Sequence, residues 1–274
     1  MINFLRKINW VRRNFKYLNP YSRISNVPES SKVVHIHFTP SHGNTISYHS
    51  DGMLLWNNSD CLESAKFKKA YLSSLIVNDW RGIDGKNMDM RWRYYMICLF
   101  AEKVSTLEGD FVECGVYKGG YSKAIIDYIS FNELGKTFYL LDTYEGLVEE
   151  FANENEINSG LVQTYSNYKN TYQEVLDLFK NDNVQIVKGR VPDTLVLCNT
   201  NKICFLSIDM NMVMPEIEAA QFFWDKLVSG GIIVLDDYGF FAHKEQRAAF
   251  DQFATEKGVS IISLPTGQAL IFKP

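Results

Sequence analysis

The pattern of apolar and polar positions changes near Gly109 of this 274-residue chain. Before that residue the pattern is irregular: residues 33–38 alternate like a short strand, and residues 46–55 are a candidate for another. Two segments, 64–77 and 92–104, have the apolar spacing of amphipathic helices. The first third of the chain therefore predicts only a few isolated elements.

From Gly109 onwards, short apolar runs alternate with segments of helical spacing. Strands that alternate with helices predict an α/β fold with a mostly parallel sheet whose two faces are covered. The expected strands are residues 111–114, 137–141, 184–187, 203–208, 230–235, 259–264 and 269–272. One expected helix follows the first strand and ends near residue 129, and three more span residues 161–180, 215–227 and 243–256. The last two strands should form a closing pair. We expect a main domain at residues 91–274 and an N-terminal extension at residues 1–90. The extension would serve as an acceptor lid or as a dimer contact.

Acidic residues follow two of the expected strands. Asp209 ends one apolar run, and Asp236 and Asp237 end another. If these strands are parallel neighbours, their ends lie about 4.8 Å apart, at the edge where open α/β sheets bind ligands. Unpaired like charges are unfavourable at such a distance, so the cluster predicts a hard divalent cation. A helix-capping acid beside a solvated one is the alternative for the Asp pair.

A glycine-containing loop follows the first strand of the main domain, at Glu113-Cys-Gly-Val-Tyr-Lys-Gly-Gly-Tyr-Ser122. Gly115 permits a tight turn, and Gly119 lets the backbone approach a ligand at the start of a helix. The spacing differs from the GxGxxG dinucleotide pattern. Asp142, at the end of the second strand, is placed to accept ribose hydroxyls. Together these features predict a nucleotide-like ligand.

Four motifs carry a family resemblance: residues 109–120, 141–147, 188–195 and 235–239. In this order they resemble the macrocin O-methyltransferase family, over roughly residues 90–274. The resemblance implies a Rossmann-like class I methyltransferase fold with a seven-stranded sheet and a C-terminal antiparallel β-hairpin. It also implies S-adenosylmethionine and Mg²⁺ as cofactors.

Carried over by position, the resemblance assigns roles to individual residues. Cofactor binding falls to Glu113, Gly115, Gly119, Ser122, Asp142 and Arg190, with Asp142 on the ribose and Arg190 near the adenine. The Mg²⁺ ligands would be Asp209, Asp236 and Asp237. Such an ion would acidify a sugar hydroxyl and hold it in line with the donor methyl group.

The chain departs from the family pattern after the fourth strand. Where relatives often have Asp-x-Asp, it has Asp209-Met-Asn211, and a neutral amide cannot accept a proton. Three outcomes stay open: another base serves, metal-bound hydroxide suffices, or the reaction differs. His243 is a candidate base because it follows the acidic loop and histidine is a common general base, although a surface or capping histidine is the alternative. The candidate catalytic residues are thus Asp209, Asn211 and His243.

These observations predict a Mg²⁺-assisted, S-adenosylmethionine-dependent O-methyltransferase. Its acceptor would be a sugar hydroxyl of a glycosylated natural product or a surface-polysaccharide precursor. Two alternatives are a non-catalytic S-adenosylmethionine-binding module that lost its base at Asn211, and a nicotinamide-dependent (NAD) oxidoreductase. The glycine spacing argues against the second.

Charge and cysteine content refine the expected partners. The net charge is −4, which gives no reason to expect nucleic acid, but residues 1–23 contribute +6 and interleave apolar residues. Such a segment can contact an anionic membrane or a partner, or pack on its own domain, and it is too interrupted to span a membrane. Five cysteines without a CxxC pair indicate free thiols in a reducing cytoplasm. We also expect a homo-oligomer.

A cationic aromatic cluster, Arg91-Trp-Arg-Tyr-Tyr95, opens the second expected helix. It could stack on a sugar or bind an acidic group. Helix packing explains it equally well.

Overall fold

The computed structural model of the protein describes residues 46–55, 57–75, 88–165 and 168–274. Residues 46–274 form one compact unit. The strand expected at residues 33–38 and the basic segment 1–23 lie outside the described residues, so both stay predictions.

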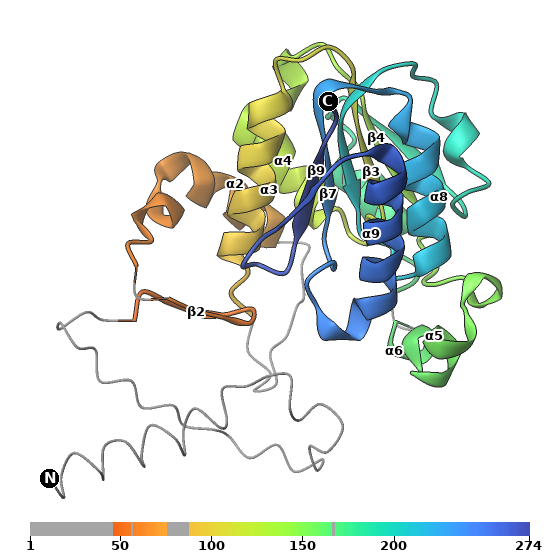
Figure 1. Cartoon of the computed structure of the whole chain (residues 1–274). Coiled ribbons are helices and arrows are strands. Elements are labelled where there is room, and N and C mark those ends of the chain that lie inside the picture. Colours follow the sequence, from red (N-terminus) through yellow and green to blue (C-terminus); the bar gives the residue numbers. More distant parts are fainter. Residues whose placement is uncertain (1–45, 56, 76–87, 166–167) are drawn as a thin grey trace, which may run out of the picture. The chain divides into compact units, whose positions relative to one another are not determined.

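A seven-stranded sheet with the order β5-β4-β3-β6-β7-β9-β8 forms the centre of this unit (Figure 1). The strands are β3 (Asp110–Cys114), β4 (Phe138–Asp142), β5 (Val184–Lys188), β6 (Ile203–Ile208), β7 (Leu227–Leu235), β8 (Ile261–Ser263) and β9 (Ala269–Phe272). Strands β3 to β7 pair in parallel, whereas β9 runs antiparallel to both β7 and β8. The predicted α/β class, the mostly parallel sheet and its antiparallel C-terminal pair are confirmed.

Helices cover both faces of the sheet (Figure 1). One face packs against α2 (Ala65–Leu75), α3 (Arg91–Val104) and α4 (Gly120–Ile129), and the other packs against α8 (Val213–Trp224) and α9 (Lys244–Lys257). Neighbouring strand residues point to opposite faces, so Phe111 belongs to the first core and Val112 to the second. Because both faces are buried, the strands are continuous apolar runs.

One predicted helix is wrong in its extent. The helix expected over residues 161–180 is two short ones, α6 (Leu161–Thr164) and α7 (Tyr172–Leu178). Asn170 has a φ of 60°, and Lys169 forms an antiparallel bridge with Glu145, so the chain leaves the helical path there. A further helix, α5 (Glu154–Asn158), was not predicted; it begins with a capping box between Asn153 and Glu156.

Short 3-10 helices complete the unit: η2 (Asp60–Glu63), η3 (Phe131–Glu133), η4 (Glu149–Phe151), η5 (Leu195–Leu197) and η6 (Phe241–His243). All five cysteines are free, as predicted.

Residues 46–55 form a hairpin rather than a single strand. Its strands, β1 (Tyr48–Ser50) and β2 (Met53–Leu55), are joined by Asp51 and Gly52, whose φ angles are 47° and 75°. Positive φ at both central residues is what a type I′ hairpin turn requires, and Asp-Gly suits it. The turn presents the Asp51 side chain toward the rest of the unit, where it is buried.

The chain reverses its direction across the sheet between β3 and β6. After β3 it adds strands on one side, and with β6 it returns to add strands on the other. Gly115, just past β3, has a φ of 90°, and a Cβ built on it would lie 1.8 Å from the carbonyl oxygen of Asp209. The loops after β3 and β6 therefore meet so closely that only glycine fits.

Substituting Gly115→Ala should destabilise the fold because it adds a backbone clash to an unfavourable φ. We expect the free energy of unfolding to fall by at least about 3 kcal/mol, as measured by urea denaturation. Gly135→Ala is the matched control, since Gly135 has a φ of 66° with nothing within 4 Å of its Cβ position, and should lose only about 1 kcal/mol. Equal losses in both variants would contradict the close approach.

Candidate active site

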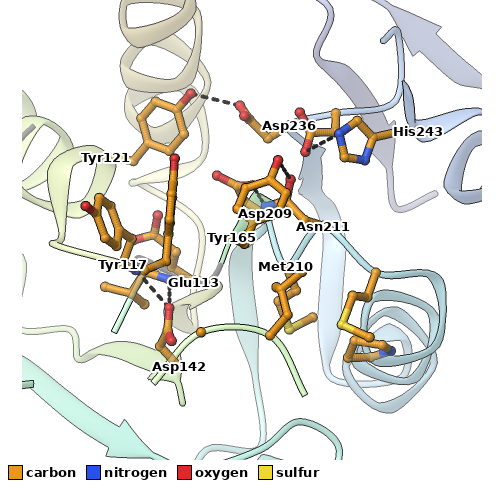
Figure 2. A pocket seen from close by; sticks show the side chains of 18 of the residues that line it. Glu113, Tyr117, Tyr121, Asp142, Tyr165, Asp209, Met210, Asn211, Asp236 and His243 are labelled. Carbon is orange, nitrogen blue, oxygen red and sulfur yellow. Dashed lines mark hydrogen bonds and ion pairs between the residues drawn. The ribbon is translucent and has the colours of Figure 1, made fainter. Parts of the chain in front are cut away.

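A cavity of about 490 Å³ opens at the carboxyl ends of β3, β4, β6 and β7. This position, at the reversal of strand order, is where open α/β sheets bind ligands. Figure 2 shows Glu113, Tyr117 and Asp142 toward one end of the cavity, and Asp209, Asp236 and His243 toward the other. The register brings these groups together because Cys114, Ile208 and Leu235 pair side by side at the strand ends.

Glu113 lines the cavity from the end of β3 and is 1% exposed. Burial raises the pKa of Glu113 to about 8, although the hydroxyl of Ser122 donates a hydrogen bond to its carboxylate. A cationic ligand next to this buried carboxyl would favour its charged form.

Asp142 organises the glycine-containing loop. Its Oδ2 accepts hydrogen bonds from the backbone N–H groups of Val116 (2.7 Å) and Tyr117 (2.8 Å), and its Oδ1 accepts one from Tyr144 (2.7 Å). The Thr143 hydroxyl also lies 3.4 Å from Oδ1, but its single proton is better placed for the Gly146 carbonyl oxygen at 2.6 Å. A carboxylate has about four acceptor positions, so one remains for a ligand hydroxyl. The side chain lines the cavity, and its role as a ribose-binding residue stays a prediction.

The other predicted cofactor residues differ in their access to the cavity. Gly115 lines it, whereas Gly119, Ser122 and Arg190 are not among the described residues that do. Ser122 lies behind Glu113 as its hydrogen-bond donor. Arg190 pairs with Glu150 and Asp193 at the surface, and its backbone neighbours line the cavity instead.

The three predicted acidic residues converge, as expected from the strand ends. Burial raises the pKa of Asp209 well above its ordinary value, and the charges of Asp236 and Asp237 raise it further. Burial and the charge of Asp236 also raise the pKa of Asp237, to about 6. This edge of the sheet therefore concentrates negative charge in a buried place.

Asp236 is held by protein donors. Its Oδ2 accepts a hydrogen bond from Nη1 of Arg93 at 2.7 Å, and its Oδ1 accepts from the Tyr121 hydroxyl (2.9 Å) and the Gln268 amide (3.0 Å). Within the described part of the chain, no group of three His, Cys, Asp or Glu side chains is placed to hold a metal ion. The predicted three-carboxylate magnesium site is thus not formed by these side chains as they lie.

Asn211 is fixed between two partners. Its amide Nδ2 donates to Asp209 Oδ1 at 3.2 Å, and its Oδ1 accepts from the Tyr165 hydroxyl at 2.6 Å. Burial raises the pKa of Tyr165, and Asp237 and Asp209 raise it further, so the phenol stays protonated. Asn211 thus orients neighbours and offers no basic atom.

His243 lies at the cavity wall and is 8% exposed. Its Nδ1 bonds to Oε1 of Gln246, whose Nε2 donates to Glu216 at 2.8 Å. An amide oxygen accepts, so in the neutral ring Nδ1 carries the proton and Nε2 is the acceptor. Nε2 lies 3.7 Å from Asp237 Oδ2. The histidine is therefore held in the tautomer that a base requires.

Several residues of the site were not predicted. Tyr165, Glu216 and Gln246 lie on loops or helices whose sequence shows no motif. Arg93 belongs to the cationic aromatic cluster that the sequence did single out, and the acidic groups that it binds are the protein's own. Pairing of residues 143 positions apart, such as Arg93 and Asp236, leaves no local pattern.

Comparison with known families gives one match that covers most of the chain. The model of the macrocin-O-methyltransferase (TylF) family matches residues 85–263. A curated relative from Streptomyces olivaceus, an 8-demethyl-8-(2,3-dimethoxy-alpha-L-rhamnosyl)-tetracenomycin-C 4'-O-methyltransferase, is 22% identical over 186 residues. That match covers 62% of this chain and 69% of the relative.

Solved structures share the fold. The O-methyltransferase NovP superposes with a TM-score of 0.65 at 17% identity, covering 79% of this chain and 99% of NovP. CalS11, a calicheamicin methyltransferase, superposes with a TM-score of 0.57 at 15% identity, covering 66% of this chain and 78% of CalS11. The Rossmann-like methyltransferase fold predicted from the motifs is confirmed.

The buried Glu113 should make the stability of the ligand-free protein depend on pH. Its folded pKa of about 8 lies above the ordinary 4.5, so its contribution is most favourable below pH 4.5 and is lost as the pH rises toward 8. Raising the pH from 5.5 to 8 should therefore lower the unfolding free energy of the parent protein by roughly 3 kcal/mol more than that of Glu113→Gln.

Urea denaturation at the two pH values measures this difference. Glu174→Gln, at an exposed position of α7, is the control and should show no such difference. A Glu113→Gln difference that stays constant with pH would mean that the carboxyl is charged throughout.

Proposed function

The chain belongs to the macrocin-O-methyltransferase family, and from this premise we propose that it transfers a methyl group from S-adenosylmethionine to a sugar hydroxyl. The acceptor would be part of a glycosylated natural product or a surface-polysaccharide precursor. One observation carries the proposal: a single cavity joins the loop organised by Asp142 to the acidic strand ends near His243.

The donor half of the cavity has groups that suit S-adenosylmethionine. When bound, this cofactor supplies an electrophilic methyl group on a sulfonium. Asp142 retains an acceptor position for a ribose hydroxyl, and Glu113 offers a buried carboxyl to the cationic methionine end. Gly115 keeps the loop close to the sheet edge. Arg190 could reach the adenine only by leaving its surface ion pairs.

The acceptor half contains oxygen ligands and aromatic rings. The carboxylate of Asp209 and the hydroxyl oxygen of Tyr165 supply acceptor atoms that suit a sugar hydroxyl. The rings of Tyr165 and Tyr168 meet edge to face at the cavity wall, with centroids 5.0 Å apart. Aromatic faces are common partners of sugar rings. The sugar class also draws support from the curated relative, whose name describes methylation on a rhamnosyl group.

Magnesium does not fit the arrangement of the three expected ligands. Both oxygens of Asp236 already accept hydrogen bonds, and one donor is the guanidinium of Arg93. A dication at this carboxylate would lie beside a fixed positive charge. The proposed reaction therefore contains no step that depends on a metal ion.

Proton removal falls to His243 in this proposal. Asn211 cannot serve as a base, whereas Nε2 of His243 is the free acceptor of a neutral ring. Bound S-adenosylmethionine would supply the methyl group and leave as S-adenosylhomocysteine, while Nε2 would take the proton of the acceptor hydroxyl. Asp237, 3.7 Å away, stabilises the imidazolium that forms.

The family match argues against only one of the two alternative functions. Family membership argues against a nicotinamide-dependent oxidoreductase, because the matched family consists of O-methyltransferases. An activity assay decides whether the protein is a non-catalytic binding module.

No helix among the described residues is long and apolar enough to cross a membrane. Cytoplasmic location, homo-oligomerisation, the acceptor role of residues 1–90 and membrane contact of residues 1–23 stay predictions.

Cofactor binding and turnover test the proposal directly. Isothermal titration should show binding of S-adenosylhomocysteine but not of NAD, and Asp142→Ala should weaken it by at least about tenfold because one buried charged hydrogen bond is lost. Asp177→Ala, at an exposed acid of α7 outside the cavity, is the control. Radiolabelled methyl transfer to rhamnosylated glycosides and nucleotide-linked deoxysugars should then give product. Cofactor binding without transfer to any sugar would favour the non-catalytic module.

Replacing His243→Gln should lower kcat by about 10² to 10⁴, the usual contribution of a general base. The affinity for S-adenosylhomocysteine should not change, because His243 lies at the acceptor end. Steady-state kinetics with an active acceptor measures the first quantity and titration the second. Full activity of this variant would move the role of base elsewhere; recovery of activity in Asn211→Asp with His243→Gln would assign it to position 211.

A further inference from the structure

The Arg93 side chain lies inside the candidate active site although it belongs to a helix on the flank of the sheet. It is 6% exposed and lines the cavity. Nε and Nη2 donate to the two oxygens of Asp51 at 3.0 and 2.9 Å, and Nη1 donates to Asp236 at 2.7 Å. The guanidinium carbon also lies 4.7 Å from the centre of the Phe240 ring. One cation therefore joins the hairpin, helix α3 and the end of β7.

Donors already reach Asp236 from three segments: Arg93 on α3, Tyr121 on α4 and Gln268 before β9. Asp236 is 5% exposed. Of about four acceptor positions on its carboxylate, one remains. A divalent ion at that position would lie within a few ångströms of the guanidinium, where like charges repel strongly in a buried site.

The charge balance points the same way. Asp51, Asp209, Asp236 and Asp237 gather at this edge, and Arg93 is paired with two of them. A bidentate contact to Asp51 fixes the plane of the guanidinium, which sets the direction of its third bond to Asp236. Removing either acid would leave a buried cation short of a partner, which is strongly unfavourable.

We propose that Arg93 is the permanent counter-cation of this acidic cluster and takes the place at Asp236 that a divalent ion would otherwise occupy. The inference uses the proposed function only to locate the cluster in the methyl-transfer site. Its consequence is that the intact protein binds divalent cations weakly here, and that Asp236 stabilises the fold whether or not such ions are present.

The test uses Mn²⁺ as the probe, followed by electron paramagnetic resonance on the full-length protein. The parent protein should bind Mn²⁺ no tighter than about 1 mM, a value typical of weak binding. Asp236→Asn should lower the melting temperature by the same amount with and without 0.1 mM Mn²⁺, a concentration about tenfold below that constant, at which the ion hardly stabilises the parent. One Mn²⁺ bound at micromolar concentration in the parent and lost in Asp236→Asn would overturn the proposal.

The variant Arg93→Met should bind Mn²⁺ at least about tenfold more tightly than the parent, because Asp236 becomes available. Arg91→Met is the matched control on the same helix; Arg91 pairs with Glu63 and Asp89 outside the cluster, and its loss should leave Mn²⁺ binding unchanged. A folded Arg93→Met with unchanged Mn²⁺ affinity would overturn the proposal. If that variant does not fold, the parent and Asp236→Asn decide the question.

Failure of this inference is separable from failure of the proposed function. Weak Mn²⁺ binding in a protein without methyl transfer would leave the role of Arg93 intact and remove the proposed activity. Tight Mn²⁺ binding at Asp236 in an active enzyme would do the reverse.

Discussion

The ion pair between Arg93 and Asp236 connects parts of the structure that share no hydrogen-bonded ladder. Buried like charges are unfavourable unless a partner neutralises them, and at this sheet edge that partner is Arg93. Arg93 neutralises Asp236 and Asp51, while burial and mutual repulsion raise the pKa values of Asp209 and Asp237. The position of helix α3 relative to β7 is therefore fixed by charge as well as by apolar packing.

Much of the fold could be predicted because parallel strands with two covered faces are plain apolar runs. The strand at Ile203–Ile208 was predicted to the residue, and the acids that follow β6 and β7 line the cavity. The helical spacing of residues 161–180 wrongly predicted one continuous helix. The helix is interrupted because of the backbone at Asn170 and a bridge to Glu145, which is a tertiary contact. Periodicity cannot report a contact with a distant segment.

The site was predicted in its residue types more than in its bonds. Asp142, Glu113 and Asp209 line the cavity, as expected from their places at strand ends. The sequence could not reveal that Asp236 already has three donors, because Arg93, Tyr121 and Gln268 come from separate elements. Nor could it show that Gln246 fixes the ring of His243, since that depends on how α9 packs beside Glu216.

The hairpin turn at Asp51 and Gly52 has a consequence for how such an enzyme could diversify. Both residues line the cavity, yet they precede every motif that shapes the donor half. Asp51 is fixed by its ion pair with Arg93, but Gly52 has nothing within 4 Å of its Cβ position. A residue that accepts positive φ, such as Asn, can stand there without moving the strand register. Substrate preference could then change through this one position while the machinery for the methyl donor is inherited unchanged.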